Sequence, residues 1–114
     1  MAMSDLLQAV VAALQGLIAS GVLTVEAGTY DASAFGNALV LLRGRRLRVR
    51  FIRDRSQVFV ELACPGLPDD WHSLQRVLAA IGVPGPGEGP LDVKTATDLL
   101  VRHVDNLEAT MCRQ

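Results

Sequence analysis

An alternation of apolar and polar residues between residues 46 and 63 constrains the fold of this chain more than any other feature of its sequence. The runs RLRVRFIR (46–53) and QVFVELA (57–63) send every second side chain to one side when the backbone is extended. The apolar set on that side is Leu47, Val49, Phe51, Val58, Val60 and Leu62. The pattern predicts two strands of a sheet with one buried face and one polar face.

The short link DRS between these runs predicts that they pair as an antiparallel hairpin. A tight turn in this link gives a register in which the numbers of paired residues sum to 109. This register sets Arg48 opposite Glu61 and Arg50 opposite Phe59, and each such contact stabilises a sheet by about 0.2–1 kcal/mol. A slip of one residue would mix the two faces, so the hydrophobic pattern favours this register.

Further periodic patterns flank the hairpin. VLTVEA (22–27) and FGNALVLL (35–42) are strand-like, and Pro65 ends the sheet because proline cannot continue a ladder. Apolar residues at three- and four-residue spacing predict helices over 4–19, 69–81 and 92–111, and the last two are separated by the loop GVPGPGEGP. The expected fold class is α+β, in which a four-stranded antiparallel meander carries three helices (α-β-β-β-β-α-α) packed on one face.

The chain is expected to form a single domain over residues 1–114, a length that can bury its own core. Ser4 can cap the first helix, Asp69 or Asp70 can cap a helix led by Trp71, and Asp92 can cap the last helix. The helix residues expected to meet the sheet, together with Val40 of the second strand, are Leu14, Ile18, Trp71, Leu78, Leu100 and Leu107.

The arginines are concentrated on the polar side of the hairpin. Residues 43–55 hold seven of the ten arginines and one acid, a formal charge of +6, and the rest of the chain holds four basic and eleven acidic residues, a charge of −7. The net charge of −1 argues against affinity of the whole protein for polyanions and leaves only a local one. Three explanations stay open: the solvated side of a strand, a nucleic-acid patch, or a contact surface for a protein.

The arginine side of the sheet also carries large apolar residues. Phe35, Leu39 and Leu41 fall on it from the second strand, and Ile52 and Phe59 join them from the hairpin. Arginine and aromatic residues without lysine are typical of a contact surface more than of a solvated one. The candidate partner-binding residues are Leu39, Leu41, Arg46, Arg48, Arg50, Ile52 and Phe59. The expected function is non-catalytic protein binding, either as a homodimer or with another protein.

The alternative is a nucleic-acid-binding module that uses the basic strand Arg43–Arg55. RDRSQVFVEL (53–62) resembles the third-strand signature of RNA-recognition motifs, but only Arg55, Phe59 and Val60 fit it. The stacking aromatics are missing, and one helix, four strands and two helices depart from the βαββαβ order of that family. A protein-contact surface is therefore favoured.

No catalytic, metal or cofactor motif is present in the sequence. His72 and His103 are 31 residues apart, without an acid or cysteine at ligand spacing. A Gly-x-Ser-x-Gly elbow is missing, and GVPGPGEGP lacks the Lys-Ser/Thr of a phosphate-binding loop. Asp69 and Asp70 could bind a metal, but capping of the following helix explains two adjacent acids at this position well enough. The sequence therefore predicts that the protein is not an enzyme and has no cofactor and no metal.

Two features bear on location. LLQAVVAALQGLIASGVL (6–23) has no basic segment before it and is interrupted by Gln8, Gln15 and Gly16, so a helix is predicted instead of a signal peptide or membrane span. A cytoplasmic protein without a membrane partner is expected, in which Cys64 and Cys112 are free thiols, with one disulfide as the alternative. Ten arginines to one lysine indicate GC-rich coding and favour a bacterial source.

Three motifs between about Ala38 and Leu107 carry a family resemblance. They are the hairpin with RDRSQVFVEL, the Trp-led segment DDWHSLQRVLAAIG and the closing segment ATDLLVRHVDNLEA. Over about 60 per cent of the chain, this arrangement resembles small bacterial α+β immunity proteins and their uncharacterised relatives. The resemblance implies a stoichiometric binder that blocks a toxin, with no catalytic residues to carry over.

Overall fold

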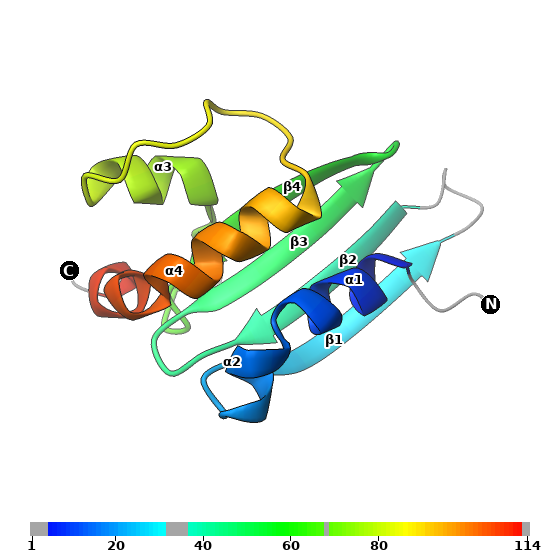
Figure 1. Cartoon of the computed structure of the whole chain (residues 1–114), viewed down its shortest axis with the longest axis horizontal. Coiled ribbons are helices and arrows are strands. Elements are labelled where there is room, and N and C mark those ends of the chain that lie inside the picture. The colour runs from blue at the N-terminus through cyan, green and yellow to red at the C-terminus, as the bar shows by residue number, and fades with distance from the viewer. Residues whose placement is uncertain (1–4, 32–36, 68, 113–114) are drawn as a thin grey trace.

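The computed structural model describes residues 5–31, 37–67 and 69–112. In the described residues two helices come first, five strands follow one another, and two helices come last (Figure 1). The elements are α1 (Asp5–Ala13), α2 (Gln15–Ala19), β1 (Thr24–Asp31), β2 (Asn37–Arg43), β3 (Arg48–Asp54), β4 (Gln57–Ala63), β5 (His72–Ser73), α3 (Leu74–Ala80) and α4 (Val93–Met111).

The strands form one antiparallel sheet in the order β1-β2-β3-β4-β5, in which each strand pairs with its neighbours in sequence. Helices α1, α2 and α4 cross the same face of this sheet, and α3 packs against β4, β5 and α4 (Figure 1). The predicted α+β meander with its helices on one side is confirmed. It has five strands instead of four, because His72 and Ser73 pair with β4 as a short edge strand.

The turn between β3 and β4 is a two-residue turn. Asp54 pairs with Gln57, which leaves Arg55 and Ser56 in the turn with φ angles of 53° and 72°. A type I′ turn requires positive φ at both central residues, and its twist matches the right-handed twist of the strands that it joins. The chain adopts this conformation without a glycine, so turn residues alone did not indicate it.

The tight turn shifts the register of the hairpin. Arg50 lies opposite Glu61 and Ile52 lies opposite Phe59, so the predicted register, with Arg48 opposite Glu61, is wrong by two residues. Because side chains alternate with a period of two, a shift of two leaves every residue on its predicted face. Cross-strand partners were therefore wrong, whereas the division between core and polar faces was right.

The apolar side of the sheet and the helices enclose one core. Phe51 is fully buried at its centre, and Val58 and Ile18 pack at its margin. The predicted core residues that are buried are Val40, Val49, Phe51, Val60, Leu62, Leu14, Leu78, Leu100 and Leu107. Full burial of one such side chain contributes about 1.5–3 kcal/mol, so this core is the main source of stability.

The N-terminal helix and first strand differ from the prediction at their ends. The helix is interrupted at Leu14, whose φ and ψ of −104° and 16° are not helical, and Ser4 lies outside the described residues. Gly21, with φ of 82°, follows α2 as the predicted stop, and β1 runs from Thr24 to Asp31 instead of over 22–27. Within the described ranges, the structure contains no helix with the length and apolar character needed to cross a bilayer.

The α3 helix begins later than predicted. Asp69 and Asp70 do not cap it; the hydroxyl of Ser73 accepts a hydrogen bond from the backbone N–H of Arg76 at 3.1 Å and caps it instead. Trp71 precedes β5, and its ring contacts arginines on the side of the sheet away from the helices. The prediction that Trp71 packs in the helix-side core is wrong, because residues next to it join the sheet.

The C-terminal helix starts where the sequence predicted it. Asp92 precedes α4, and a hydrogen bond with the Thr95 side chain lowers the pKa of the Asp92 carboxyl. The Gly/Pro-rich loop before it is held by Gln75, whose Nε2 donates to the carbonyl oxygens of Gly87 and Gly89 at 3.2 and 2.9 Å. A buried amide therefore fixes a segment that has no secondary structure of its own.

A disulfide joins the last long strand to the last helix. Cys64, directly after β4, bonds to Cys112, directly after α4, with Cα atoms 5.1 Å apart. The prediction of two free thiols is wrong, because the fold brings to one corner two ends that are 48 residues apart in sequence. The bond ties the helix layer to the sheet.

Candidate protein-contact face and adjoining groove

The side of the sheet opposite the helices, here named the open face, combines apolar and charged residues in separate rows. One row crosses three strands through Leu39, Ile52 and Phe59, which lie opposite one another. The next row contains Leu41 and Arg50, also opposite one another. Of the seven candidate residues, six share this face: Leu39, Leu41, Arg48, Arg50, Ile52 and Phe59.

A bulge in β1 directs an acid toward the arginines of the open face. The register with β2 shifts between Val25 and Ala27, which leaves Glu26 without a strand partner. An extra residue in a strand changes the direction of its side chain. The Glu26 carboxylate forms ion pairs with Arg43 at 3.8 Å and with Arg48, on β3, at 3.2 Å. Only 18% of the Arg48 side chain is exposed, so the Arg48 pair is partly shielded from solvent.

Arg50 is held from two sides. Its Nε and Nη2 donate to the same oxygen of Glu61, at 2.6 and 2.5 Å, and its guanidinium carbon lies 4.2 Å from the centre of the Trp71 ring. The guanidinium of Arg48 lies 5.5 Å from the same ring. Cation–π contacts of this kind contribute about 0.5–2 kcal/mol, depending on desolvation. The ring of Trp71 therefore covers one end of the open face.

The apolar end of the open face has no such cover among the described residues. Leu39, Leu41, Ile52 and Phe59 are half-buried, and the described helices lie on the other side of the sheet (Figure 1). Phe35, which was predicted to join them, lies outside the described residues. Partly exposed leucine, isoleucine and phenylalanine in adjoining rows are the composition expected at the centre of a contact surface.

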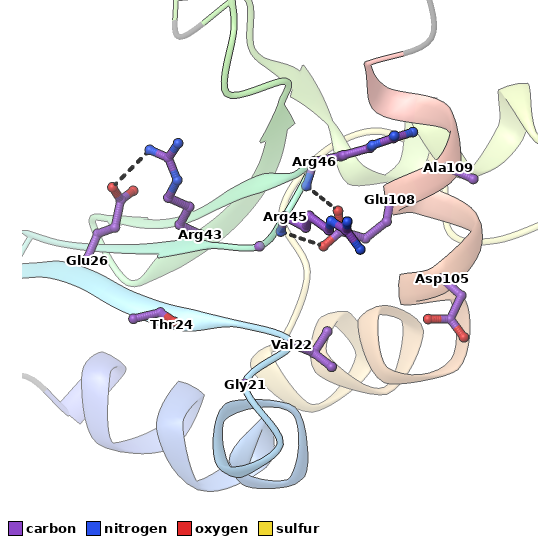
Figure 2. Close-up of a pocket in the computed structure, with 11 residues that line it drawn as sticks. Gly21, Val22, Thr24, Glu26, Arg43, Arg45, Arg46, Asp105, Glu108 and Ala109 are labelled. Atoms are coloured by element: carbon purple, nitrogen blue, oxygen red, sulfur yellow. Dashed lines mark hydrogen bonds and ion pairs between the residues drawn. The ribbon is translucent and has the colours of Figure 1, made fainter.

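The arginines of residues 43–55 do not form one basic surface. Arg43, Arg48 and Arg50 lie on the open face, and Arg53 lies opposite the buried Ala38, on the helix side. Arg46 was predicted on the open face, and that placement is wrong because β3 begins after it. It belongs to the loop between β2 and β3, beside α4 (Figure 2).

A groove of about 940 Å³ lies at the corner where this loop meets α4 (Figure 2). Glu108 of α4 closes one side of it, since its two carboxylate oxygens accept hydrogen bonds from the backbone N–H groups of Arg45 and Arg46 at 3.1 and 2.5 Å. A Cβ added to Gly44 would collide with the Glu108 carboxylate, so glycine permits this close approach. Arg43 and Glu26 connect the groove to the open face.

The histidines do not form an enclosed site. Nε2 of His72 lies 3.2 Å from Oδ1 of Asp70, but 41% and 60% of these side chains are exposed. They border a shallow hollow of about 290 Å³ that also includes Cys64, whose sulfur is in the disulfide. His103 is half-buried on α4. In the part of the chain that the structure describes, no group of three or more His, Cys, Asp or Glu residues is placed to hold a metal ion.

Sequence reasoning missed three residues of this region: Glu26, Trp71 and Glu108. Glu26 lies in a strand-like run that gives no sign of a bulge. Trp71 is followed by His72 and Ser73, which look like the start of a helix in the sequence. Glu108 was hidden because its partners are backbone groups more than 60 residues away. Only the excess of arginine over nearby acids pointed to distant carboxylates as partners.

Comparisons of this chain with protein-family models, with curated proteins and with solved structures gave no match. The interpretation of the open face and the groove therefore depends on their own geometry and chemistry.

Proposed function

We propose that this protein is a non-catalytic protein-binding domain that uses its open face to contact a second copy or another protein. The observation that carries the proposal is the row of Leu39, Ile52 and Phe59 on a face that none of the described helices covers. Burial of such a row favours association by about 25 cal/mol for each Å² of apolar surface removed from water, and the freedom lost on association offsets part of this gain. Neutralisation of a bacterial toxin, as the resemblance to immunity proteins implies, is one form of this function.

Paired arginines support a protein partner over a nucleic acid. Arg48 and Arg50 already interact with Glu26, Glu61 and Trp71, so phosphates would have to displace these partners. Charged groups that are paired within the chain can fix the orientation of a partner without providing most of the affinity. Nucleic-acid binding through residues 43–55 remains the alternative function.

The disulfide bears on the compartment in which this function operates. Disulfides persist in oxidising environments and are rare in the cytosol. The Cys64–Cys112 bond therefore favours an oxidising compartment over the cytoplasm that the sequence suggested.

Sedimentation velocity over a range of protein concentrations tests for self-association. Ile52→Asp places a charge in the centre of the apolar row, and Val101→Asp is its control, because Val101 is 48% exposed on α4. We expect the wild-type chain and Val101→Asp to form dimers and Ile52→Asp to stay monomeric.

If the wild-type chain is monomeric throughout, the same three proteins serve as bait for partners from the source cell. A protein that wild type and Val101→Asp retain and Ile52→Asp loses supports the proposal. Monomeric behaviour together with the same captured proteins for all three baits would contradict it.

A further inference from the structure

We propose that the groove between α4 and the β2–β3 loop is a second binding site, which takes an extended peptide segment with one carboxylate beside an apolar side chain. Its volume of about 940 Å³ lies within the range of about 300–1,000 Å³ that is typical of ligand sites. The site is separate from the apolar row of the open face, so it can operate whether or not the open face binds a partner.

Some charged groups of the groove already have partners within the chain, and others do not. Glu108 holds two backbone N–H groups, and Glu26 is shared between Arg43 and Arg48. By contrast, within the described parts of the chain the guanidinium groups of Arg45 and Arg46 form no ion pair or hydrogen bond. Two exposed guanidiniums on one loop, each able to bind a carboxylate through two parallel hydrogen bonds, are thus left for a ligand.

The position of the loop is fixed before any ligand arrives. The carboxylate of Glu108 joins the loop to α4, and the backbone N–H of Gly44 donates to the carbonyl oxygen of Leu47 at 2.6 Å. A preformed site loses less conformational entropy on binding than a flexible one. The backbone that carries Arg45 and Arg46 is therefore pre-organised.

The balance of charge indicates which anions fit. The lining residues include three arginines (Arg43, Arg45 and Arg46) and three acids (Glu26, Asp105 and Glu108), so their formal charges cancel. Because the lining is neutral overall, the second charge of a phosphate and the repeated charges of a nucleic acid add no net attraction, whereas a single carboxylate already makes the two parallel hydrogen bonds that one guanidinium offers.

The remaining wall of the groove is apolar or uncharged. Val22 and Ala109 contribute side-chain carbon beside the glycines Gly21 and Gly44. Such a wall favours an aliphatic side chain next to the carboxylate. An acidic peptide segment of a protein is therefore the ligand that we infer.

Isothermal titration calorimetry and NMR shift mapping with a blocked Gly-Leu-Glu-Leu-Gly peptide test the inference. We expect saturable binding that shifts the amide signals of Gly44, Arg45 and Arg46, and a Gln version of the peptide that binds about tenfold more weakly. Arg46→Ala and Arg45→Ala should each weaken binding by about tenfold, and Asp105→Asn should strengthen it because one repulsive charge is removed.

Arg102→Ala is the matched control, because Arg102 is exposed on α4 and does not line the groove. It should leave the affinity unchanged, as should Ile52→Asp on the open face, so failure of this site and failure of the proposed function are distinguishable. Lack of peptide binding, equal weakening by Arg102→Ala, or tighter binding of inorganic phosphate or mixed RNA than of the peptide would overturn the inference.

Discussion

The two faces of the sheet are built from alternate residues of the same strands, yet different interactions stabilise them. On the helix side, Val49, Phe51 and Leu62 are fully buried among apolar neighbours. On the open face, Arg48 and Arg50 are held by carboxylates and by the ring of Trp71. The stability that comes from apolar burial depends on close packing and is not weakened by salt. Partly exposed ion pairs contribute little to the free energy of unfolding, and salt screens them. The helix side therefore contributes most of the stability of the fold, and the open face contributes less.

This difference predicts that equal truncations on the two faces have unequal costs. Phe51→Ala should lower the free energy of unfolding by about 3–5 kcal/mol because it leaves a cavity in the core. Phe59→Ala, the same change on the open face, should cost about 1–2 kcal/mol because its ring is already partly solvated. Chemical denaturation at low protein concentration measures both. Equal losses would mean that the two faces are equally buried in solution.

The disulfide connects the helix layer with the sheet, so its removal should affect both. Reduction, or replacement of both cysteines by serine, should lower the free energy of unfolding by about 2–4 kcal/mol, since a long loop in the unfolded chain is released. Thermal unfolding with and without reductant measures the loss. An unchanged midpoint would show that Cys64 and Cys112 are not bonded in solution.

Trp71 should matter less, because it lies over the charged end of the open face. Trp71→Ala should cost about 1–2 kcal/mol through lost contacts with Arg48 and Arg50. Trp71→Phe retains an aromatic face and should recover part of this loss. Denaturation followed by circular dichroism is suitable, since the variants lack the only tryptophan. A loss above about 3 kcal/mol would instead place Trp71 in the core.

The smallest effect is expected for the bulge acid. Glu26→Gln should lower the free energy of unfolding by about 0.5–1 kcal/mol, and added salt should shrink the difference, because the pairs with Arg43 and Arg48 are partly exposed. Unfolding at low and high ionic strength measures this. A difference that does not respond to salt would mean that Glu26 acts through packing and not through charge.

The sequence predicted most of the fold because alternation of residues decides which strand face is buried. The bounds of β4, the start of α4 and the burial of Phe51 are as expected. The register of β3 with β4 and the conformation of the turn between them were harder to predict. A turn with positive φ at Arg55 and Ser56, neither of them glycine, depends on the twist of the strands that it joins.

The candidate site was predicted in outline and not in its contacts. Six of its seven residues share a face because strand periodicity is a local property. Their partners are distant in sequence: Glu26 reaches Arg48 through a bulge, and Trp71 is carried to the open face by β5. Neither a bulge nor a two-residue strand has a local sequence signal strong enough to indicate it.

The central proposal is that this face recognises protein and not nucleic acid, because its arginines are already paired within the chain. Trp71, the only tryptophan, lies against Arg50 and reports directly on this face. The decisive measurement is a titration of its fluorescence with mixed RNA and DNA at two salt concentrations. The account predicts no change at micromolar nucleic acid. Micromolar binding with a log–log salt slope of about −4 to −5, lost when Arg43, Arg48 and Arg50 are replaced by alanine, would contradict it.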